Sequence, residues 1–216
     1  MSLMSPTVAG IAGVVGVVVA LLAALVPALA YQGYQKERFD PRNHFISELG
    51  EVGISRAARV FNAGLILTGL VLIPFMVGAA VYTAHWLGYV AGVVGVVTTL
   101  AVAAVGVFPM NKLSSHSIAA LTFFNAGQVT SLLFSLCVIF IPTARLPLWL
   151  LIPTGLSTLA FVAFLRTPFT ADNAEAFTKD RQAFVRPRWW LSPTLEWSVY
   201  FTVLAWIFCL ALVLLQ

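Results

Sequence analysis

The sequence predicts an all-α polytopic membrane protein, a six-transmembrane-helix bundle with a short interfacial or re-entrant helix near residues 40–50. Hydrophobic residues make up 60% of the 216 residues, charged residues make up 9%, and the mean hydropathy is +0.95. A soluble domain of this size carries far more charge. Six apolar stretches reach the roughly 20 residues needed to cross a hydrocarbon core of about 30 Å. They cover residues 8–30, 58–81, 86–108, 117–141, 146–166 and 194–215.

Charged residues gather on one predicted side of the membrane. With six spans, the loops 31–57, 109–116 and 167–193 share a side, and these loops with the adjoining span ends hold every Lys, Arg, Asp and Glu except Arg145. Because Lys and Arg are retained in the cytoplasm during insertion, we expect these loops inside and both termini outside. The chain then forms a single domain, 1–216, in a prokaryotic plasma membrane.

The spans should be helical because backbone groups in hydrocarbon must pair within their own segment. Between the first two spans, Asp40 resembles an N-cap, Pro41 suits a first helical position and Gly50 suits a helix stop. A short helix over 40–50 would place His44, Ser47 and Glu48 on one face. A histidine and a carboxylate four residues apart can form a proton-transfer pair or the salt-bridged face of an ordinary interfacial helix.

Two asparagines interrupt the spans that begin at residues 58 and 117. Asn62 lies one turn into its span and Asn125 lies a few turns into the other. A buried amide needs hydrogen-bonding partners, so each asparagine either binds a lipid headgroup or bridges two helices.

Two further polar residues lie at the starts of spans. His116 follows Ser114 and Ser115, either of which could cap the helix, and its imidazole could serve as a base or a ligand at this depth. Glu196 follows Ser192 and Pro193, which we expect to open the last span, and an acid in a first turn also suits the helix dipole. The connector before that span has amphipathic spacing over residues 171–184.

Short motifs in this order resemble those of the DRAM/Sfk/PGAP-type six-span family, most closely its prokaryotic branch known as domain of unknown function 998. The motif residues are Ile46, Ser47, Glu48, Leu49, Gly50, Phe61, His116, Ala119, Ala120, Phe123, Gly127, Glu196 and Trp197. The resemblance implies six helices with a polar cluster formed by the first long loop and the starts of spans four and six. Eukaryotic relatives are linked to lipid organisation and to remodelling of lipid-anchored proteins, which implies a lipid-related role.

These observations leave three functions open. The first is binding, transport or regulation of lipid at a headgroup-level site, for which we name His44, Asn62, Asn125 and Trp197 as binding residues. The second is lipid modification by acyl transfer or hydrolysis, with His116, Glu48, Glu196 and Ser47 as catalytic residues. The third is a structural lock between the loop and the bundle.

The expected partners are membrane lipids, including anionic headgroups near the basic loops, rather than nucleic acid. We expect no cofactor, and the acidic set with His44 and His116 lacks the spacing of known zinc motifs. Neither the oligomeric state nor the substrate follows from these patterns.

Overall fold

The computed structural model describes residues 5–141, 145–167 and 184–216, and it is all-α in those ranges. Six helices are long and apolar enough to span a membrane. Five of them are α1 (Pro6–Ala30), α2 (Ala58–Thr83), α3 (Trp86–Val107), α4 (Leu113–Phe140) and α7 (Leu191–Leu214). The sixth is α5 (Leu151–Arg166), which a 3-10 turn over Leu148–Leu150 extends. The predicted six-span fold is confirmed.

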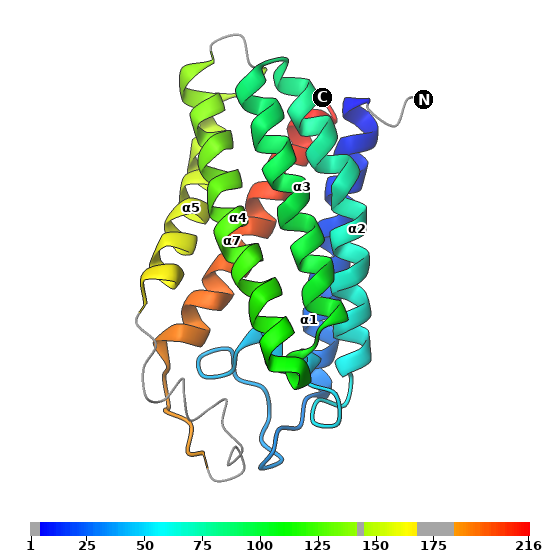
Figure 1. Cartoon of the computed structure of the whole chain (residues 1–216), viewed down its shortest axis with the longest axis vertical. Coiled ribbons are helices and arrows are strands. Elements are labelled where there is room, and N and C mark those ends of the chain that lie inside the picture. The colour runs from blue at the N-terminus through cyan, green and yellow to red at the C-terminus, as the bar shows by residue number, and fades with distance from the viewer. Residues whose placement is uncertain (1–4, 142–144, 168–183) are drawn as a thin grey trace.

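The helices form a closed ring. Each helix packs against the next along the chain, and α7 packs on both α5 and α1, which closes the ring. Both termini lie at one end and the long segment 31–57 lies at the other, here called the loop end (Figure 1). The common end for the termini agrees with an even number of spans, whereas the orientation across the membrane stays a prediction.

Small residues allow neighbouring helices to approach closely, as is common where lipid supplies no hydrophobic drive for helix association. At Gly69 in α2, an added Cβ atom would collide with the Thr99 carbonyl oxygen and the Ala103 backbone nitrogen in α3. The α2–α3 contact is therefore made partly between backbones.

The short helix of the first long loop differs from the prediction in length and type. It is a five-residue 3-10 helix over Ile46–Gly50, called η1, and not a helix that begins at Asp40. The Asp40 carboxylate accepts the Arg42 backbone N–H at 3.0 Å, in a turn that ends before η1. Glu48 reaches back to the Phe45 backbone N–H at 2.9 Å and so closes the start of η1.

The starts of α4 and α7 also differ in detail. No serine side chain caps α4, which begins at Leu113, and α7 begins at Leu191, one residue before the predicted cap Ser192. The predicted amphipathic segment 171–184 lies, except for Phe184, outside the described residues.

Candidate functional site

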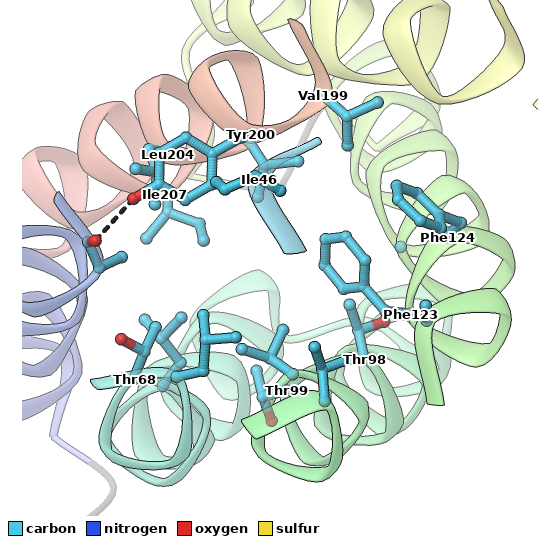
Figure 2. A pocket seen from close by; sticks show the side chains of 18 of the residues that line it. Ile46, Thr68, Thr98, Thr99, Phe123, Phe124, Val199, Tyr200, Leu204 and Ile207 are labelled. Atoms are coloured by element: carbon cyan, nitrogen blue, oxygen red, sulfur yellow. Dashed lines mark hydrogen bonds between the residues drawn. The ribbon is translucent and has the colours of Figure 1, made fainter. Parts of the chain in front are cut away.

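The ring of helices encloses a cavity of about 120 Å³, here called the central cavity. Apolar side chains form most of its wall, among them Leu72, Val102 and Leu204. In Figure 2, Phe123 of α4 points into this space, and residues of α2, α3 and α7 surround it.

The hydroxyl groups in the wall of the central cavity are mostly bonded within the protein. Thr98 and Thr130 donate to carbonyl groups of their own helices, and their oxygens lie 3.0 Å apart. Tyr200 donates to the Ala20 carbonyl at 2.6 Å, the dashed line in Figure 2. The middle of the cavity therefore suits a hydrocarbon better than a polar molecule.

A second cavity, of about 410 Å³, lies at the loop end between α4, α5 and α7, and is here called the mouth. Its wall includes Leu113 and Leu121, which are exposed on the outside of the bundle, together with Phe164 and Leu165 of α5. In Figure 1, α4 and α5 separate toward the loop end, with α7 visible between them. The mouth therefore opens on the outer surface of the bundle.

Three polar residues line both cavities and so stand where the two meet. They are Ser47 of η1, His116 of α4 and Glu196 of α7, and we call them the junction residues. Two apolar residues of α4, Ala120 and Phe124, also line both cavities.

His116 is buried, with 7% of its surface exposed, and has a fixed ring orientation. Its Nδ1 lies 2.9 Å from the Phe108 carbonyl oxygen at the end of α3. A carbonyl can only accept, so Nδ1 carries a proton and, in the neutral ring, Nε2 is left as an acceptor. That nitrogen is the one available to a molecule at the junction.

Glu196 joins α7 to η1. Its Oε2 accepts the Ile46 backbone N–H at 2.7 Å, although the residue is 8% exposed. Within residues 5–141, 145–167 and 184–216, Glu196 forms no salt bridge. A carboxyl group with no cationic partner in an apolar wall is costly to ionise, which makes Glu196 the most unusual polar residue of the site.

Glu48 belongs to a different cluster, although it follows Ser47 directly. It forms a bidentate ion pair with Arg186, whose Nη1 lies 3.1 Å from Glu48 Oε1. Tyr31 donates to the same carboxylate at 3.5 Å. Burial, and then the charge of Glu48, raise the pKa of Tyr31 above its ordinary value. Glu48 lines neither cavity, so the structure separates it from the junction residues.

His44 lies beside this second cluster. Its Nδ1 is 2.8 Å from Asn43 Oδ1, and its Nε2 is 3.7 Å from Glu37 Oε1. Burial lowers the pKa of His44, which the nearby carboxylate of Glu48 opposes. Burial disfavours the charged form of Arg186 and so lowers its pKa. The neighbouring Glu48 carboxylate outweighs this effect, and the pKa of Arg186 is raised. We call Tyr31, Glu37, His44, Glu48 and Arg186 the loop-end cluster.

The other proposed binding residues have structural partners. Asn62 donates to the Gly50 carbonyl at 2.9 Å and so bridges α2 to η1, and Trp197 donates to the His44 carbonyl at 3.1 Å. Asn125 is exposed on the outside of α4 and donates to Leu121 of its own helix. None of these three residues lines the central cavity or the mouth.

Sequence reasoning missed Arg186, Tyr31 and the Phe108 carbonyl. Arg186 was counted with the charges that orient the chain, since nothing in the loop 167–193 distinguishes it from Arg188. Three acids over residues 37–48 signal a need for a basic partner, but they do not identify it. Among the described residues, no three His, Cys, Asp or Glu side chains come together as a metal-binding group.

Residues 8–213 match the family described as protein of unknown function (DUF998). The chain belongs to this family. The match extends over nearly the whole of the six-helix ring, so η1, the junction residues and both cavities lie within the DUF998 domain. No curated protein and no solved structure matches the chain.

Proposed function

We propose that this polytopic membrane protein binds a lipid-derived amphiphile, with a hydrocarbon chain in the central cavity and a polar head at the junction residues. The observation that carries the proposal is the shared wall of Ser47, His116 and Glu196, which joins an apolar interior to a mouth on the bundle surface. Pockets with an apolar wall and a few convergent polar groups are the usual form of small-molecule sites. Polar groups within membrane spans are also costly and serve function by default.

The length of the central cavity along α4 agrees with that of a membrane chain. His116 and Thr130 of α4 both line it, and at 1.5 Å per residue they stand about 21 Å apart along the helix. One leaflet of the hydrocarbon core is about 15 Å thick. A volume of about 120 Å³ is below the roughly 150 Å³ of a cavity that binds one benzene molecule, so the cavity holds a short part of one chain, and a longer chain requires the lining side chains to move apart.

The resemblance to DRAM/Sfk/PGAP-type proteins supports the same lipid-related role. Anionic lipid headgroups would then lie outside the cavities, against exposed bases of the loop end such as Arg56, Arg59 and Lys112.

The proposal is tested by blocking the junction. Ala120→Phe places a ring where the two cavities meet, whereas Ile118→Phe adds the same ring on the exposed side of α4. Native mass spectrometry of purified protein should show a retained amphiphile in the unmodified protein and in Ile118→Phe. The amount retained should fall at least about tenfold in Ala120→Phe, because the added ring removes the space for the hydrocarbon chain. Equal retention in both variants would overturn the proposal.

One observation favours a second function, lipid modification. His116 presents Nε2 at the junction with its tautomer set by Phe108, close to the hydroxyl-bearing Ser47 and the carboxyl group of Glu196. A fixed neutral imidazole is what a general base requires. Incubation of the protein with membrane lipids distinguishes the two functions: binding alone yields no product of changed mass, whereas a product made by the parent chain and not by His116→Gln would establish catalysis.

A further inference from the structure

The junction residues leave three polar groups open to the head of a ligand. Glu196 Oε2 is bonded to the Ile46 N–H, and the second carboxyl oxygen has no hydrogen-bond partner among the described residues. His116 Nε2 is an acceptor in the neutral ring, because Nδ1 donates to the Phe108 carbonyl. The Ser47 hydroxyl, which can donate or accept, also has no partner in the described ranges.

Among the described residues, no Lys or Arg side chain lines either cavity. Arg186 is the mostly buried cation of the loop end, and it is bound to Glu48 in the separate loop-end cluster. The bases Arg56, Arg59, Lys112 and Arg166 are exposed and line neither cavity, although Leu165 and Thr167, the neighbours of Arg166 in the chain, line the mouth. A phosphate or free carboxylate head would therefore find no cation in the walls of the two cavities, where an unpaired charge is costly.

An ammonium head meets the opposite conditions. It carries three N–H donors and no acceptor, which suits the open oxygen of Glu196, the His116 Nε2 and the Ser47 hydroxyl. Its charge would also supply the counter-ion that Glu196 lacks among the described residues, in the manner of a buried ion pair.

We infer that the amphiphile is a single-chain lipid with a protonated amine head, held at the junction by Glu196, His116 and Ser47. This inference rests on the proposed function and adds the chemical class of the head. The amine enters through the mouth, because Leu113 and Leu121 place the edge of that cavity on the surface of the bundle.

Three probes with the same tail and different heads test the inference: hexadecylamine, hexadecanol and palmitic acid, each added to purified protein in nanodiscs at pH 7. We expect hexadecylamine to bind at least about tenfold more tightly than either of the others, since one charge-assisted hydrogen bond accounts for a factor of that size. Glu196→Gln retains an oxygen for the Ile46 N–H but carries no charge, so it should remove most of the preference for the amine.

The outcomes separate the head class from the proposed function. Palmitic acid or hexadecanol binding as tightly as hexadecylamine, or an unchanged preference in Glu196→Gln, would overturn the amine head while the binding site stands. Absence of binding for all three probes, or equal binding by Ala120→Phe and Ile118→Phe, would overturn the proposed function itself. Thermal unfolding of each variant verifies that any loss of binding occurs in folded protein.

Discussion

Two neighbouring residues, Ser47 and Glu48, show how sharply the loop end divides its polar groups. In a 3-10 helix with three residues per turn, successive side chains point about 120° apart. Ser47 therefore reaches the junction while Glu48 turns toward Arg186 and Tyr31. The sequence predicts both on one polar face of an α-helix. It does not reveal the partner of Glu48, because Arg186 lies 138 residues away along the chain.

Among single residues of the loop-end cluster, Arg186 and Glu48 should contribute most to the stability of the protein through their ion pair. Arg186→Met leaves the buried Glu48 without its cation, and we expect the free energy of unfolding to fall by about 3 kcal/mol, the low end for a broken buried pair because Arg186 is partly exposed. Adding Glu48→Gln should restore part of the loss. The exposed Arg188→Met serves as control, with a change within about 0.5 kcal/mol. Detergent-solubilised protein in denaturant provides the measurement, and equal effects of both arginine variants would contradict the assignment.

His44 predicts how stability depends on pH. Its pKa in the folded protein is lowered by burial, so the folded state binds a proton less readily than the unfolded chain. The stability contributed by neutral His44 is then fully present above the ordinary value of 6.5 and decreases as the pH falls below it. His44→Phe retains a ring against Tyr31 and Phe39 but cannot titrate. Melting temperatures at pH 7 and pH 5 should differ less in this variant, and an equal difference in both proteins would count against the argument.

Helix elements follow from the sequence more directly than the loop does. Each span requires only an apolar run of sufficient length, which is a local property, so all six were predicted within a few residues of their observed bounds. The short helix near residues 40–50 depends instead on distant contacts. Its backbone is held by Glu196 at Ile46 and by Asn62 at Gly50, and no local pattern reveals either bond.

The close packing of helix α2 on helix α3 predicts how a substitution at Gly69 changes thermal stability. Gly69→Ala would push a methyl group into the backbone of α3 at Thr99 and Ala103, so α2 must move away. Gly155→Ala in α5 is the matched control, since an added Cβ atom there meets nothing within 4 Å. We expect Gly69→Ala to lower the melting temperature and Gly155→Ala to leave it unchanged or slightly higher, because alanine favours helix more than glycine does. Fluorescence-detected size-exclusion chromatography after heating measures the melting temperature of each variant. Similar melting temperatures would contradict a direct backbone contact between α2 and α3 at Gly69.

For the whole molecule, the ring explains why the candidate site could be located only in part. The sequence places His116 and Glu196 at similar depth, because both stand near helix starts on one side of the membrane. That they face a shared interior depends on α7 closing the ring against α1 and α5, and this arrangement is set by packing over the full length of the helices. The mouth depends likewise on where α4 and α5 separate.

The orientation of the whole ring is the last prediction. Arg145 is the one charged residue at the end that holds the termini, and the exposed Arg56 lies at the loop end. Because basic residues are retained in the cytoplasm, Arg145→Cys should react with a membrane-impermeant maleimide in intact cells, whereas Arg56→Cys should react only after permeabilisation. The parent chain is the control, because Cys137 is buried and Cys209 is half-buried within their helices. Labelling of Arg56→Cys alone in intact cells would reverse the orientation and place the mouth in the outer leaflet, so the same experiment determines which leaflet supplies the amphiphile.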